Sequence, residues 1–219
     1  MPYKRNYRRK RYYKRKPQGY SRYMTWQNAH RALVLAKHLK TLVNVERKVV
    51  DITQSGATFS SSTAHVGDLN VCAQGDTDLT RDGAQMKMIR HAIRGEITMN
   101  ASATGTICRI IVCMKKDTGG AAPSNLGSIC TSNSTRAFYD RNHIYNFRIL
   151  YDKTFALSSD RPNIYFRYAK KLKDVVRFDG TGATVADIAR NGVFILALSD
   201  QATNTPTIKY HSRVTFVDN

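Results

Sequence analysis

The first sixteen residues of the chain, MPYKRNYRRKRYYKRK, cannot form a hydrophobic core by themselves. They contain nine Lys and Arg, four Tyr and no acidic residue. Because the like charges repel one another in water, we expect this segment to stay extended and disordered on its own. The rest of the chain must therefore supply the folded domain, and the basic segment needs a partner of opposite charge.

The partner that this segment predicts is a nucleic acid. A polyanion removes the repulsion between the cations and releases its condensed counterions, which favours binding whatever the base sequence. The tyrosines lie between the cations, where each ring can stack on an unpaired base for about 1–3 kcal/mol, so a single strand is favoured over a duplex. The predicted contacts in this segment are the cations Lys4, Arg5, Arg8, Arg9, Lys10, Arg11, Lys14, Arg15 and Lys16 and the tyrosines Tyr3, Tyr7, Tyr12 and Tyr13.

Such a basic run also has simpler interpretations. It is typical of a nuclear localisation signal, which would add a nuclear import receptor to the partners, and it can serve as a solubilising tail or bind a membrane surface. A membrane partner is disfavoured, since the sequence has no apolar run of about 18 residues and no acylation signal. We expect no secretory signal either, because no apolar stretch follows the charges.

The charge of the chain is concentrated near its start. Residues 1–48 carry fifteen Lys and Arg against Glu46 alone, whereas residues 49–219 carry twenty Lys and Arg against fifteen Asp and Glu. About 170 residues are enough for one domain with a real core and too few for two. The four cysteines form no CxxC pair, and the two in an apolar run, Cys108 and Cys113, are expected to be buried free thiols.

A basic amphipathic helix is predicted over residues 26–44, after an arm over residues 1–25. Apolar residues recur at three- and four-residue steps from Ala29 to Val43, and Thr25 is a suitable N-cap. A helix that docks on the folded domain, a second nucleic-acid contact and a helix on a membrane surface all fit this pattern. The second interpretation adds four cations to the predicted nucleic-acid contacts: Arg22, Arg31, Lys37 and Lys40.

From residue 45 to residue 219 the signals are those of β structure. Apolar runs between turn residues predict strands near 45–53, 66–73, 85–99, 106–116, 145–151, 155–157, 164–169, 175–178, 193–198 and 207–216. A Gly/Ser/Thr loop is predicted over 54–63, a long loop over 117–135 and a helical turn near 184–190. Many strands with so little helix predict an all-β antiparallel sandwich or barrel.

A second basic cluster lies on and after the strand predicted at 164–169, and consists of Arg167, Lys170, Lys171, Lys173 and Arg177. It either extends the path of the nucleic acid or forms an ordinary solvated surface, and the sequence leaves both interpretations open. The same strand offers aromatic candidates for stacking on bases, of which strand alternation buries at least one: Tyr165, Phe166 and Tyr168.

The residues that could carry catalysis or bind a metal form no known motif. Asp76, Asp78 and Asp82 crowd one loop, but the bidentate Glu of a calcium loop is missing and Asp-Gly turns explain the pattern. The six histidines form no HExxH pair, and neither a phosphate-binding loop nor a GxSxG elbow occurs. We therefore predict no enzyme, no metal site and no cofactor.

Several segments, taken in order, resemble known viral proteins. The tyrosine- and arginine-rich start, the basic helix and LVNVERKVVDIT resemble the capsid proteins of small circular single-stranded DNA viruses, the circovirus-like group. The rest resembles capsid proteins of the satellite tobacco necrosis virus type, through the Gly-Asp loop at 75–83, MKMIRHAIRGEITMN, the apolar run at 107–114, FRILYDKTFALS and NGVFILALSD. The resemblance covers nearly the whole chain.

The resemblance implies an eight-stranded antiparallel jelly roll of two four-stranded sheets over residues 45–219. It implies a virion protein of which about sixty copies form a small icosahedral T=1 shell around single-stranded DNA rather than RNA, with assembly in the host nucleus. A satellite-type single-stranded RNA virus capsid shares these structural expectations. The alternative from another class is a non-viral single-strand-binding module with a basic tail. Satellite-type capsids can bind calcium between subunits, but no such ligands map onto this sequence.

Overall fold

The structure is a computed structural model that describes residues 22–42 and 46–218, with helix side chains described for residues 26–36. The chain divides into two compact units, Met1–Val45 and Glu46–Asn219. We refer to the second unit as the body.

The first unit contains one described helix, α1 (Arg22–Leu42). It begins earlier than the predicted residue 26, because the residues from Arg22 to Thr25 include no glycine or proline that would end it. Its apolar side chains are not confined to the predicted stripe: Leu33, Val34 and Leu35 are 54%, 51% and 61% exposed. Since consecutive helical residues point about 100° apart, these three cover a wide arc of the helix surface.

No helix in the described part of the chain has the length and apolar character needed to cross a membrane.

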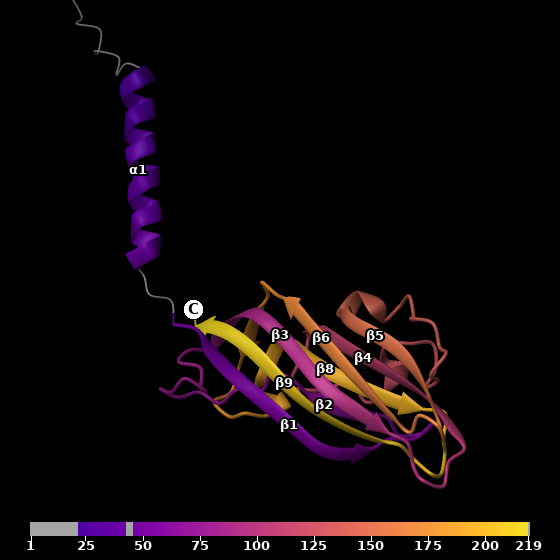
Figure 1. Cartoon of the computed structure of the whole chain (residues 1–219). Coiled ribbons are helices and arrows are strands. Elements are labelled where there is room, and N and C mark those ends of the chain that lie inside the picture. Colours follow the sequence, from indigo (N-terminus) through magenta and orange to yellow (C-terminus); the bar gives the residue numbers. More distant parts are fainter. Residues whose placement is uncertain (1–21, 43–45, 219) are drawn as a thin grey trace, which may run out of the picture. The chain divides into compact units, whose positions relative to one another are not determined.

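Within residues 46–218 the body is built from nine strands (Figure 1). They are β1 (Lys48–Thr58), β2 (His65–Asp68), β3 (Gln85–Thr98), β4 (Gly105–Asp117), β5 (Phe147–Ser158), β6 (Asn163–Lys171), β7 (Val175–Phe178), β8 (Ile188–Ser199) and β9 (Thr207–Asp218). Three short 3-10 turns, Leu126–Ser128, Ile144–Asn146 and Val185–Asp187, lie in the connections.

The strands pair in the order of a jelly roll. One four-stranded sheet runs β1-β9-β3-β6 and the other runs β2-β8-β4-β5, with every pair antiparallel. The short strand β7 pairs with both β3 and β8, and so joins the two sheets by hydrogen bonds. Apart from this added strand, the pairing is that of the eight-stranded jelly roll, and the predicted fold class is confirmed.

Four strands differ clearly in extent from the prediction. β2 ends at Asp68 rather than at residue 73, and β8 begins at Ile188, within the predicted helical turn, rather than at residue 193. β1 continues to Thr58 through the predicted Gly/Ser/Thr loop, because its pairing with β9 resumes at Ala57 after a bulge. β5 is a single strand where two short ones are predicted. The polar residues between the two, from Asp152 to Thr154, stay in register with β4.

The main core lies between the two sheets. It includes Ile93 of β3, Ile110 of β4, Ile195 of β8 and Val214 of β9, each at most 1% exposed. A second, smaller core covers the opposite face of β4 and β8. All four cysteines are buried free thiols, as predicted for Cys108 and Cys113.

Candidate nucleic-acid interface

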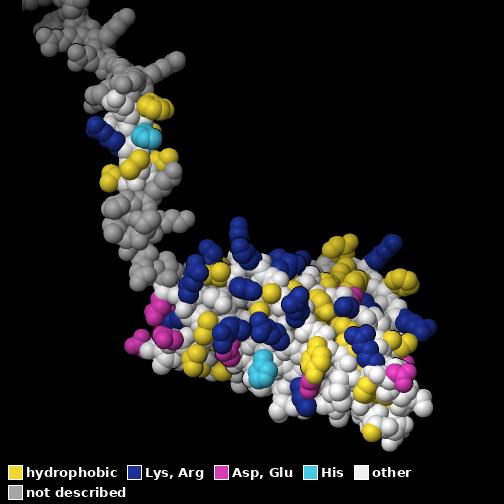
Figure 2. All heavy atoms as spheres, in the orientation of Figure 1, with side chains coloured by type: hydrophobic (Ala, Val, Ile, Leu, Met, Phe, Trp, Pro, Cys, Tyr) yellow, Lys and Arg dark blue, Asp and Glu magenta, His cyan; other side chains and the backbone are white. Residues whose placement is uncertain are grey.

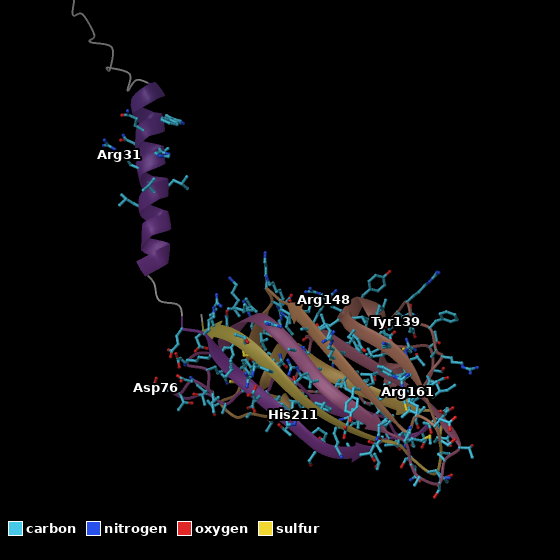
Figure 3. All side chains as sticks on the ribbon, in the orientation of Figure 1. Arg31, Asp76, Tyr139, Arg148, Arg161 and His211 are labelled. Carbon is cyan, nitrogen blue, oxygen red and sulfur yellow. The ribbon has the colours of Figure 1, made fainter. Side chains whose placement is uncertain are left out.

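Most of the predicted nucleic-acid contacts lie outside the described residues. The nine cations and four tyrosines of residues 1–16 are among these, and the side chains of Arg22, Lys37 and Lys40 on α1 are not described. Arg31 is described and is exposed on α1 (Figure 3). Near it, the rings of Trp26 and His30 stack with their centroids 5.6 Å apart. The role of all these residues stays a prediction.

On the body, exposed cations gather over β3, β6 and β9 (Figure 2). Successive side chains of a strand point to opposite faces of a sheet, so that every second residue of β1, β9, β3 and β6 points away from the core. Besides Lys87, where β3 pairs with β7, six exposed Lys and Arg occupy such positions, against two carboxylates. The cations are Arg90, Arg94, Arg167, Lys171, Lys209 and Arg213, and the carboxylates are Asp51 and Glu96. We call this surface the basic face.

Two of the six cations are neutralised by neighbours on the basic face. Arg213 donates two hydrogen bonds to the Asp51 carboxylate, at 2.7 and 2.6 Å, and these lower the pKa of Asp51. Nζ of Lys209 lies 3.3 Å from a carboxylate oxygen of Glu96. The other four cations make no ion pair with any described carboxylate. The basic face therefore keeps a surplus of positive charge.

The register of β3 and β6 places these free cations directly opposite one another. Arg94 faces Arg167, and Arg90 faces Lys171. Between the two pairs lie Ala92 and Ala169, whose side chains are too small to cover the charges. Because like charges directly opposite each other destabilise a sheet, this arrangement gains stability when an anion binds between them.

The basic face is hollowed along these strands. A cavity of about 560 Å³ is lined by residues of β1, β3 and β9 that include Arg90, Arg94 and Arg213. A second hollow of about 720 Å³ is lined by residues of β3, β6 and β9 that include Arg167. Arg94 and His211 line both hollows, and Figure 3 shows His211 on this side of the body. The two hollows therefore adjoin on the basic face, on either side of Arg94 and His211.

The second basic cluster of the sequence is only partly on this surface. Arg167 and Lys171 belong to the basic face, whereas Lys173 lies after β6 and Arg177 lies on β7. Lys170 is exposed near the end of β6, but it precedes Lys171 directly and therefore points to the opposite side of the sheet.

The aromatic candidates divide as strand alternation predicts. Tyr165 is 75% exposed and lines the second hollow, while Phe166 is buried in the main core at 6%. Tyr168 is half-buried, and its ring lies edge-on to His91 at a centroid distance of 5.6 Å. Tyr165 is thus the member of the three that can stack on a ligand.

Four cations of the basic face were not identified from the sequence: Arg90, Arg94, Lys209 and Arg213. A signal was present, since two pairs of basic residues are spaced four apart, in RHAIR and in KYHSR. This spacing puts both members of a pair on one side of a strand. The sequence does not show that β3 and β9 are neighbours in the sheet, because the two strands are far apart along the chain.

The acidic loop before β3 makes polar contacts with its neighbours in the body. Nζ of Lys48 donates a hydrogen bond to Asp82 at 2.5 Å and forms an ion pair with Asp218 at 3.0 Å, and the two carboxylates raise the pKa of Lys48 despite its burial. The guanidinium of the buried Arg81 donates to the carbonyl oxygens of Cys72, Gly83 and Gly180. Among the described residues, no group of three His, Cys, Asp or Glu side chains is arranged to hold a metal ion.

Comparisons with known proteins add little to this geometry. No protein-family model matches the chain, and no curated protein matches it. Among solved structures, the chain is similar to the "KBV activated particle at acidic pH", with 10% identity and a TM-score of 0.38, covering 75% of this chain and 68% of that one. It is also similar to the cryo-EM structure of Broad Bean Stain Virus, with 12% identity and a TM-score of 0.35, covering 78% of this chain and 86% of that one. Likenesses this weak carry no argument, and the fold rests on the strand pairing.

Proposed function

We propose that this chain is a viral capsid protein that self-assembles into a shell of sixty subunits and packages single-stranded DNA through its basic arm. The observation that carries the proposal is the joining, in one chain, of a jelly-roll body to a segment with nine cations in sixteen residues. Jelly rolls occur as viral capsid domains, lectin domains and cupins. Of these classes, the capsid is the one whose work requires neutralising a long polyanion.

The charge of the arm is consistent with a packaged single strand. Residues 1–48 have a net charge of +14. Sixty copies, the number that the sequence resemblance implies, would bring about 840 positive charges, enough for a strand on the order of a thousand nucleotides. A single strand also bends at little cost, whereas duplex DNA, with a persistence length of about 50 nm, resists confinement in a small shell.

The proposed role is structural rather than enzymatic. The body supplies the contacts between copies in the shell, and the arm neutralises phosphates inside it. The tyrosine-rich start, which is part of the resemblance to capsid proteins of single-stranded DNA viruses, favours DNA over RNA. The same run of cations is proposed to be read by a host nuclear import receptor before assembly.

Electron microscopy of the purified full-length protein, combined with its ratio of nucleic-acid to protein ultraviolet absorbance, tests the proposal. We expect uniform closed particles that contain nucleic acid, and extracted contents that deoxyribonuclease digests. Contents digested by ribonuclease instead would move the proposal to a single-stranded RNA capsid. Small species that stay small after single-stranded DNA is added would overturn it in favour of a single-strand-binding module.

The role of the arm is tested by deleting residues 1–16. We expect the deletion to abolish packaging and nuclear import while the body stays folded, because its cores lie within residues 46–218. A matched variant replaces the four arm tyrosines with serine and keeps all nine cations, which separates stacking from charge. A deletion variant that still enters nuclei and packages normally would contradict this assignment.

A further inference from the structure

We infer that the basic face is itself a binding site for a single-stranded polynucleotide, separate from the arm. The inference deepens the proposed function and rests on it for the identity of the strand as the packaged one. Three steps, all based on the body alone, lead to this inference.

The first step is that the basic face is built to hold anions. Arg94 opposes Arg167 and Arg90 opposes Lys171, and none of the four has a described carboxylate within ion-pair distance. An exposed sheet position accepts many uncharged residues, so two successive like-charge pairs are a cost that a bound anion removes. Three of the four are arginines, whose planar guanidinium can bind phosphate through two hydrogen bonds.

The second step is that the anion is a chain rather than a single ion. Arg90 and Arg94 are four residues apart along β3, which is about 14 Å at 3.4 Å per residue. That separation is too large for one phosphate to bridge. The cavity that contains both arginines also adjoins the second hollow at Arg94 and His211. A ligand with repeated negative charges, laid along the sheet, satisfies both cation pairs at once.

The third step is that the chain carries unpaired bases. Tyr165 lies two residues from Arg167 on the same face of β6 and opposite Glu96 of β3. Its side chain is 75% exposed, so packing within the body does not explain an aromatic residue there. Stacking of a base on such a ring contributes about 1–3 kcal/mol and requires a base that is not paired. A sulfated polysaccharide would use the cations and leave the ring unused.

The first test measures the salt dependence of binding for the full-length protein and a labelled oligothymidine, by fluorescence anisotropy. Each phosphate contact on a single strand contributes about 0.7 to the slope of log K against log salt concentration. We therefore expect the double variant Arg94→Ala with Arg167→Ala to reduce this slope by about 1.4. The control is Arg141→Ala with Arg161→Ala, which removes the same charge from exposed positions off the basic face and should leave the slope unchanged.

The second test locates the base. Irradiation of the full-length protein with a 5-iodouracil-containing strand is expected to cross-link Tyr165, as mapped by mass spectrometry of the peptides. Tyr165→Phe should keep the cross-link and Tyr165→Leu should lose it. An unchanged slope in the Arg94/Arg167 variant, together with no cross-link at position 165, would overturn the inference. A reduced slope without the cross-link, matched by an equal loss of heparin binding, would overturn the polynucleotide assignment.

These outcomes are separable from failure of the proposed function. Particle formation and nucleic-acid content report on the capsid role, whereas the slope and the cross-link report on the basic face. A full-length protein that forms no particles can still show both signals, and filled particles can form through the arm when both signals are missing.

Discussion

The outer face of the sheet β2-β8-β4-β5 is apolar and covered, whereas the outer face of the sheet β1-β9-β3-β6 is charged and open. On the covered face, Ile111 of β4 and Phe194 of β8 are fully buried against Leu126 and Ile129 of the β4–β5 connection. On the open face, the corresponding outward positions carry the six cations of the basic face. The two sheets share one core, so the difference shows that a long connection, rather than the jelly roll itself, decides which face is free to bind.

Polar contacts also hold the β4–β5 connection, residues 118–146, against the sheet; we call this connection the cover. The guanidinium of Arg109, on β4, donates two hydrogen bonds to Asp152 of β5, at 3.0 and 2.7 Å, and a third to the carbonyl oxygen of Ala137 in the cover, at 2.6 Å. The hydroxyl of Tyr139, also in the cover, donates to Asp152 at 2.5 Å. Burial alone would raise the pKa of Asp152, but these hydrogen bonds outweigh it and lower that pKa. The connection is therefore fastened to the sheet at a charged site beside its apolar core.

The largest expected difference between the two faces is in stability. Phe194→Ala is expected to reduce the free energy of unfolding by about 3–5 kcal/mol, because it leaves a cavity between β8 and its cover. Arg94→Ala, on the open face, should change it by less than about 0.5 kcal/mol. Chemical denaturation of both variants measures the difference. Equal effects would show that the two faces do not differ as described.

A pH effect is expected beneath the basic face. Burial lowers the pKa of His91 to about 4, and its Nε2 lies 2.9 Å from the hydroxyl of Ser212. The unfolded chain, with a histidine pKa near 6.5, binds the proton first as the pH falls. Stability contributed by neutral His91 is therefore full above pH 6.5 and is lost towards pH 4, by about 3 kcal/mol in total.

Denaturation midpoints between those two pH values measure this loss. His91→Gln should flatten the dependence, and the exposed His143→Gln serves as the control. A His91→Gln variant with an unchanged pH profile would exclude His91 as its source.

A smaller effect on stability is expected at the Arg109–Asp152 ion pair beside the cover. Asp152→Ala leaves the nearly buried guanidinium of Arg109 without its partner, and we expect a loss of about 2 kcal/mol. Hydrogen exchange should then accelerate in residues 118–146 and stay unchanged in β3 and β9. Uniform acceleration across both sheets would show that this contact stabilises the whole body rather than the cover.

The smallest expected effect concerns the open face. Asp51→Asn frees Arg213 from its ion pair and should leave the denaturation midpoint unchanged, since exposed ion pairs contribute little. The same variant should steepen the salt dependence of single-strand binding by about 0.7 in slope, through one added phosphate contact. An unchanged slope would place the polynucleotide away from Arg213.

Much of the fold could be predicted because local sequence patterns mark most of the strands. The bounds of β7 match the predicted 175–178, and those of β3 differ by one residue, since turn residues and apolar patterns mark both. The sequence also shows the continuous apolar runs of β4 and β8, but it does not show why both faces of these strands are apolar. They are buried on both faces because the predicted loop after residue 117 folds back over them.

The candidate site was predicted less completely, because it depends on which strands become neighbours. Arg167 and Lys171 were identified as a cluster along the chain, whereas the free cations opposite them on β3, Arg90 and Arg94, are brought there by long-range pairing. The arm residues are the reverse case: their charge and aromatic pattern is entirely local. Their role in binding stays a prediction.

Cryo-electron microscopy of particles assembled from the full-length protein would show both the shell and the position of the strand. We expect a closed shell of jelly-roll subunits, with density for single-stranded nucleic acid lying against the basic face, between Arg94 and Arg167. Failure to form a closed shell would overturn the capsid role, and a closed shell with the basic face turned to the outer solvent and free of nucleic acid would overturn the role of the basic face.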